Sequence, residues 1–166
     1  MTLRRVAGAL SSALLLALVG ARPAGFGPYD MKLSATPKAP SATGTGRLIF
    51  APSPFGIAST ADGHAVYDIQ VTAAGLPAPS SLGAAYKTYI AWAVTPDLNN
   101  WTRLGTIANG ENTVGPVDLN KFLVVVTAES SPTSSTHDGP TVLHGSSPSA
   151  WLQSFISHPM FRGMPP

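Results

Sequence analysis

The chain has 166 residues, of which 44% are hydrophobic and 11% charged, and it contains no cysteine. This length predicts one domain of ordinary size, and the lack of cysteine excludes disulfides, thiolate metal sites and cysteine nucleophiles. Its 16 glycines and 16 prolines make long helices unfavourable. Arg4 and Arg5 belong to an N-terminal leader, which leaves eight basic against eight acidic residues. The basic residues are scattered singly, so no nucleic-acid partner is expected.

Residues 1–21 show the order of charged, apolar and small residues that is typical of a secretory signal. Arg4 and Arg5 precede an apolar run over residues 6–21, which ends in Val19-Gly20-Ala21. A helix that spans a bilayer needs roughly 20 residues, so the sequence favours a cleaved signal over a retained membrane anchor. Both alternatives predict a periplasmic or exported chain, and retention would fix residues 6–21 in the inner membrane.

Residues 22–46 are rich in Pro, Gly, Ala, Ser and Thr and predict an extended tether, because few of their side chains can fill a core. Residues 131–166 are expected to form a flexible tail with one short helix. Ser147 and Pro148 are typical of a helix start, which places this helix over residues 148–157. Its apolar side chains share one face and predict a docking stripe: Trp151, Leu152, Phe155 and Ile156.

Residues 47–130 carry the strand patterns and predict a small antiparallel β-sandwich. The strands are expected over residues 47–51, 65–72, 86–95, 101–107, 113–114 and 122–127. The turn at Asn109-Gly110 predicts that strand 113–114 pairs with strand 101–107. The run 122–127 is apolar enough to be central in the sheet. Alternation over 86–95 places Tyr86 and Trp92 on one face and Tyr89 on the other.

Four segments of this region resemble, in their order, a known family: residues 75–77 (GLP), 89–97 (YIAWAVTPD), 104–107 (LGTI) and 122–129 (FLVVVTAE). The family is the extracytoplasmic C-terminal domain of anti-sigma-K-type factors. The resemblance covers about half the chain and implies an immunoglobulin-like sandwich that senses or docks outside the membrane without catalysis. The sigma-binding helices and zinc motif of that family are not found in the five residues before the apolar run. Sigma-factor sequestration is therefore not implied.

A serine hydrolase needs a serine, a histidine and an acid in contact, and five residues supply those types: His137, Asp138, Ser146, Ser147 and Ser149. The G-x-S-x-G motif that presents such a serine does not occur in the sequence. The eight carboxylates form no adjacent pair that would suggest acid–base chemistry. We therefore expect a protein that is not an enzyme and uses no cofactor.

Metal binding has only scattered candidates. His158, Met160 and Met164 offer the imidazole and thioether ligands that suit copper(I) outside the cytoplasm. Asp62 and His64 lie two positions apart before a predicted strand. Solvated loop residues account for the same pattern, and no zinc spacing is met. The sequence therefore predicts no metal site.

Four aromatic residues are of the kind that stacks on carbohydrate, but strand alternation divides them between core and outer face: Tyr86, Tyr89, Trp92 and Trp101. The sequence as a whole predicts a non-enzymatic exported protein that acts by protein–protein docking. Its most concrete form is an accessory subunit on the periplasmic face of a membrane assembly, such as a respiratory or photosynthetic complex. The alternative is a free periplasmic module that binds a ligand or copper.

Overall fold

The structure is a computed structural model that describes residues 27–54, 56–61 and 64–148. The described residues form strands and one short 3-10 helix, so the predicted all-β class is confirmed. The elements are β1 (Asp30–Ala35), β2 (Thr43–Phe50), β3 (Pro52–Ser53), β4 (Gly56–Ile57), β5 (Tyr67–Ala74), η1 (Pro79–Leu82), β6 (Thr88–Val94), β7 (Trp101–Ile107), β8 (Gly110–Val117), β9 (Leu123–Glu129) and β10 (Thr141–Ser146).

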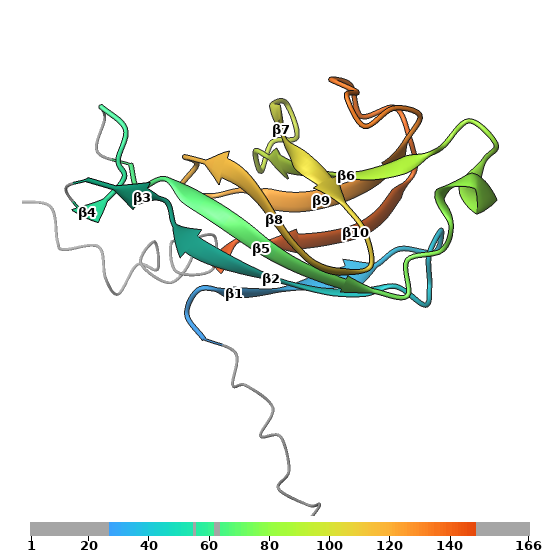
Figure 1. Ribbon diagram of the computed structural model, residues 1–166, viewed down its shortest axis with the longest axis horizontal. Helices are drawn as coiled ribbons and strands as arrows, with labels where there is room; N and C mark the ends of the chain where they lie inside the picture. Colours follow the sequence, from blue (N-terminus) through green and yellow to red (C-terminus); the bar gives the residue numbers. More distant parts are fainter. Residues whose placement is uncertain (1–26, 55, 62–63, 149–166) are drawn as a thin grey trace, which may run out of the picture.

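Eight strands form one antiparallel sheet in the order β7-β6-β9-β10-β1-β2-β5-β8, and β3 and β4 form a separate hairpin. The sheet bends so that its two halves face each other as layers (Figure 1). β1 joins the layers, because residues 30–33 pair with β2 whereas Ser34 and Ala35 pair with β10. β7 and β8, at the two ends of the order, come close together and complete the enclosure.

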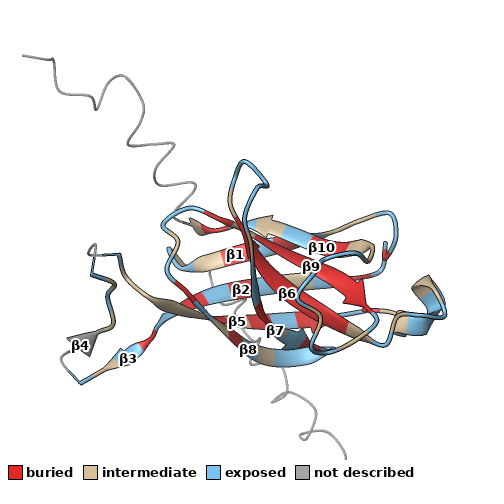
Figure 2. Ribbon diagram, turned by 90° about the horizontal axis from the view of Figure 1, so that it is seen from above, coloured by how far each residue is buried: buried red, intermediate tan, exposed pale blue. Residues whose placement is uncertain are grey.

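One hydrophobic cluster fills the space between the layers. Ile69 and Val71 enter it from β5, and Val124 and Val126 enter it from β9, all of them completely buried. The period of two in each strand directs these side chains to the same face. Figure 2 shows the buried residues along β6 and β9. Each such side chain contributes about 1.5–3 kcal/mol to folding, which makes this cluster the main source of stability.

The predicted tether is wrong over residues 30–35 and 43–46, which belong to β1 and β2. Met31 and Leu33 are buried in the core, where glycines of β2 make room for them. A side chain at Gly46 would place its Cβ 2.8 Å from Met31 Cγ, and one at Gly44 would lie 3.1 Å from Leu33 Cβ. The glycines that suggest a loose tether are therefore required for close packing.

The predicted tail is wrong over Thr141–Ser146, because these residues form β10 between β9 and β1. The sheet consequently runs from residue 30 to residue 146 instead of from 47 to 130. The leader over residues 1–21 and the docking helix beyond Pro148 lie outside the described residues. No helix within the described ranges has the length and apolar character needed to cross a bilayer.

The structure differs from the sequence predictions in the pairing of β8 and in the position of Tyr86, and it confirms the central position of β9. β8 pairs with β5 rather than with β7, because the chain crosses from one layer to the other at Asn109 and Gly110. β6 begins only at Thr88, so Tyr86 packs against the inner cluster and does not share a face with Trp92. β9 lies between β6 and β10 and is buried on both faces, as predicted for the run 122–127.

Candidate functional site

The exposed large apolar side chains of the described residues gather at one end of the sheet: Tyr29, Ile49, Phe50 and Leu98. Tyr29 precedes β1, Phe50 ends β2, and Leu98 lies in the turn between β6 and β7. The register across β6, β9, β10, β1 and β2 brings these strand termini to the same end. Together with Tyr67 at the start of β5, this set of residues is named the apolar end.

Three aromatic rings form one half of the apolar end, where β2 ends and β5 begins; the β3–β4 hairpin, which joins these two strands, lies at the left of Figure 1. The Tyr29 ring meets the Phe50 ring edge-on, with centroids 5.5 Å apart, and the Phe50 and Tyr67 centroids are 5.0 Å apart. Phe50 and Tyr67 are paired in register, and Leu48 N donates a hydrogen bond to the Tyr29 carbonyl at 2.9 Å. Tyr67 packs on the inner cluster, so the rings continue the core to its end, where it meets solvent.

An ion pair fixes the chain beside these rings. Arg47 Nε donates to Asp30 Oδ1 at 2.6 Å, and Arg47 Nη2 donates to Oδ2 at 3.1 Å. Gly27 N donates to the same carboxylate at 2.7 Å. The Arg47 guanidinium, and after it the Gly27 N–H, hold the pKa of Asp30 below its usual range because both stabilise the charged carboxylate. Tyr29 lies inside this turn and is held against β2.

Leu98 forms the other half of the apolar end and is the most exposed of the set, at 56%. Its φ of 61° lies in the left-handed region, which costs a residue with a side chain about 1–2 kcal/mol. The turn is braced by Asp97, whose carboxylate accepts from Asn99 Nδ2 at 2.7 Å, and by Trp101 Nε1, which donates to the Leu98 carbonyl at 3.0 Å. Hydrogen bonds from Thr95 and then Asn99 lower the pKa of Asp97. A rigid, strained turn therefore presents an apolar side chain to solvent.

The predicted division of the four aromatic residues is confirmed for Tyr89 and Trp92. Tyr89 lies in the inner core, where its hydroxyl donates to the Pro77 carbonyl at 2.9 Å and burial raises its pKa. Trp92 is buried on the opposite face of β6. Trp101 is half-buried and stacks on His137, with centroids 3.7 Å apart. The four residues therefore form no common carbohydrate platform.

A buried polar chain holds the loop over residues 130–140 against the outer face of β9. Trp92 Nε1 donates to Thr127 Oγ1 at 2.8 Å, and Thr127 Oγ1 donates to Glu129 Oε1 at 2.6 Å. The same oxygen accepts from Gly139 N at 3.3 Å, and Glu129 is only 3% exposed. The hydrogen bond from Gly139 ties the loop to this network. The network therefore helps to position the loop, whose His137 stacks on Trp101.

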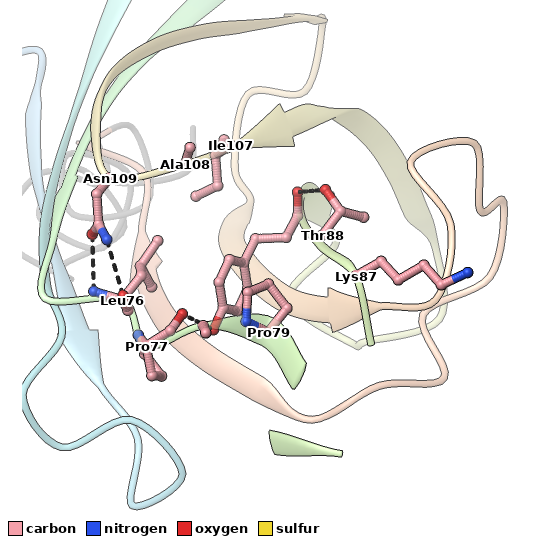
Figure 3. Close-up of a pocket in the computed structure, with 10 residues that line it drawn as sticks. Leu76, Pro77, Pro79, Lys87, Thr88, Ile107, Ala108 and Asn109 are labelled. Carbon is pink, nitrogen blue, oxygen red and sulfur yellow. Dashed lines mark hydrogen bonds between the residues drawn. The ribbon is translucent and has the colours of Figure 1, made fainter. Parts of the chain in front are cut away.

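A cleft of about 380 Å³ opens at the end of the sheet opposite the apolar end (Figure 3). Asn109 Oδ1 accepts from Leu76 N and Asn109 Nδ2 donates to Leu76 O, both at 2.9 Å. The Tyr89 hydroxyl donates a hydrogen bond to the carbonyl of Pro77, and both residues line the cleft. These polar groups brace the wall of the cleft and do not converge on a ligand.

The structure does not bring the described hydrolase candidates together. His137 stacks on Trp101 of β7, whereas Ser146 lies in β10, three strands away in the sheet order. Asp138 accepts from the Thr136 hydroxyl at 2.6 Å. Within the described ranges, no three His, Asp or Glu side chains gather as a metal site requires. The copper candidates and the predicted docking stripe lie outside the described residues: His158, Met160, Met164, Trp151, Leu152, Phe155 and Ile156.

Sequence reasoning missed the apolar end. Tyr29 falls in the predicted tether, and Phe50 and Tyr67 fall in two separate predicted strands with no sequence pattern that connects them. Aromatic residues at the last or first position of a strand are the only signal that could have indicated them. A scan of the sequence against models of protein families found no matching family, and searches of curated proteins and of solved structures found no relative.

Proposed function

We propose that this chain is a non-enzymatic exported protein that acts by docking, as an accessory subunit on the periplasmic face of a membrane assembly. Its partners are other subunits of that assembly. The observation that carries the proposal is the position of the exposed large apolar side chains, which gather at the apolar end. Such side chains are normally scattered singly over the surface of a soluble protein, and their clustering marks an interaction site.

Leu98 supports the same function independently. Backbone strain at a bulky exposed residue is of no benefit to folding, and strained residues cluster at functional positions. A rigid apolar knob is the kind of anchor that fills a pocket in a partner protein. The bent two-layer antiparallel sheet supports the sandwich class of the family that the sequence resembles, whose domains dock outside the membrane.

The membrane location rests on the sequence of the leader and on where the described chain begins and ends. Gly27 and Pro148 both lie at the apolar end, because β1 starts there and β10 finishes there. The apolar run over residues 6–21 therefore ends nine positions before Asp30, where the chain enters the sheet. A retained leader would turn the apolar end toward the assembly.

The test is a photo-cross-link from Leu98 in the cells that produce the protein. Leu98 is replaced by p-benzoylphenylalanine, and Lys38, exposed in the turn between β1 and β2 at the opposite end, is the control position. After illumination the protein is purified from membranes in mild detergent and its intact mass is measured. We expect position 98 alone to capture a subunit of a membrane complex, and the mass to begin at Met1 or Thr2.

A chain that begins at Arg22, is recovered alone from the soluble fraction and gives no cross-link at position 98 would overturn the proposal. That result would favour the free periplasmic module. Titration of the purified chain with copper(I) would then be the next measurement.

A further inference from the structure

We infer that the aromatic half of the apolar end, formed by Tyr29, Phe50 and Tyr67, rests on the lipid bilayer interface. The inference deepens the proposed function, on whose retained leader it depends. It separates two contacts at one end of the molecule. Leu98 meets a partner protein, and the aromatic half meets lipid.

The chemistry of the aromatic half suits the boundary between headgroups and acyl chains. Tyrosine combines an apolar ring with a polar hydroxyl, and aromatic residues are enriched at membrane interfaces for that reason. Tyr29 is 44% exposed and Phe50 is 36% exposed, and their rings are in contact, so they present one apolar surface. Ile49, at 40% exposure, lies on the opposite face of β2 beside its register partner Asp68 and does not belong to this surface.

The charges near the rings point to contact through apolar burial rather than through attraction to anionic lipid. The Arg47 guanidinium is paired with Asp30 by two hydrogen bonds, so these two residues carry no net charge together. Asp68 follows Tyr67 directly and Asp118 follows Val117, the register partner of Tyr67, so these two residues add two negative charges, while Lys121 before β9 adds one positive charge. Binding is therefore expected to depend little on salt.

The length of chain outside the described residues limits how far the rings can lie from the bilayer. Tyr29 lies eight positions after Ala21, where the apolar run ends, and a fully extended chain of that length spans at most about 28 Å. Pro148 leaves the sheet at the same end, and the predicted apolar stripe begins three residues later. Two segments outside the core are predicted to be apolar, residues 6–21 and the stripe beyond Pro148. Both therefore join the sheet at the end that carries the rings.

The test measures the immersion depth of single spin labels on the full chain, leader included, in phosphatidylcholine vesicles. Because the chain has no cysteine, Phe50→Cys and the control Lys38→Cys each give one labelled site. We expect the label at position 50 to collide more often with oxygen and less often with a water-soluble nickel complex than the label at position 38. Adding Tyr29→Ser to the Phe50→Cys chain is expected to return that label to water.

If the label at position 50 stays in water although the chain is bound to the vesicles, the inference is overturned and the proposed function is unaffected. If collisions of this label with both oxygen and the nickel complex decrease only when subunits of the assembly are present, the aromatic half contacts protein. That result would also overturn the inference of lipid contact. Failure of the proposed function shows separately, in the Leu98 cross-link and the N-terminal mass.

Discussion

Asp30 orders the aromatic half of the apolar end through hydrogen bonds from Arg47 and Gly27. These bonds lower its folded-state pKa below the ordinary value of about 3.9. A lowered folded-state pKa contributes stability that is present above pH about 4 and is lost as the pH falls through the folded-state pKa. We therefore expect Asp30→Asn to lower the melting temperature at pH 7, and the difference from the natural chain to shrink in acid.

Thermal unfolding followed by circular dichroism between pH 7 and pH 2 checks this expectation. Asp118→Asn, at an exposed position between β8 and β9, is the matched control and should change the melting temperature little. A deficit of Asp30→Asn that stays constant down to the lowest pH would show that the ion pair has another role.

Leu98 allows stability and docking to be separated in one variant. Asparagine tolerates a positive φ better than leucine does, so Leu98→Asn is expected to raise the free energy of unfolding by up to about 1 kcal/mol. The same change removes the apolar knob and should abolish co-purification with the partner subunit. Urea unfolding and membrane purification measure the two effects. A variant that is less stable than the natural chain would contradict the assignment of strain.

On the element scale, the outer face of β9 combines an apolar cluster around Val125 with buried polar contacts at Thr127 and Glu129, whereas its inner face is apolar. Thr127 links Trp92 to Glu129 and is itself buried. Thr127→Val keeps the shape of the side chain but leaves the indole N–H and the carboxylate without this partner. Because a buried polar group without a partner costs about 1–3 kcal/mol, the variant should lose roughly 2 kcal/mol or more.

Urea unfolding measures this loss, with Thr72→Val on the exposed face of β5 as the control. An exposed substitution of this kind changes stability by no more than about 0.5 kcal/mol. Equal effects of the two changes would show that the chain of hydrogen bonds from Trp92 to Glu129 does not contribute to stability.

At the scale of the whole molecule, β1 and β10 hold the two layers together. Without them the core loses Met31, Leu33, Val142 and Leu143, all of which are buried. We therefore expect a fragment of residues 47–130 to remain unfolded, whereas residues 27–148 fold. Near-ultraviolet circular dichroism and the cooperativity of urea unfolding distinguish the two states. Cooperative unfolding of the shorter fragment would refute this account of the core.

The sequence by itself determined the class of the fold and the strands with long apolar alternation. β7 lies over the predicted residues 101–107, and β9 is central as its composition indicates. These features are local, because alternation and turn residues act within a few positions of the chain. β1 and β10 escaped this reasoning, since each is short and lies among Gly, Pro, Ser and Thr.

Only the tertiary structure decided which strands pair and which side chains share a surface. Gly44 and Gly46 belong to a packed strand because Leu33 and Met31 fill the space beside them, a relation that no local pattern carries. Tyr29 and Phe50 are 21 positions apart and meet only when β1 pairs with β2. Strand register is set by long-range contacts across the core, so the apolar end emerges only after the sheet has closed.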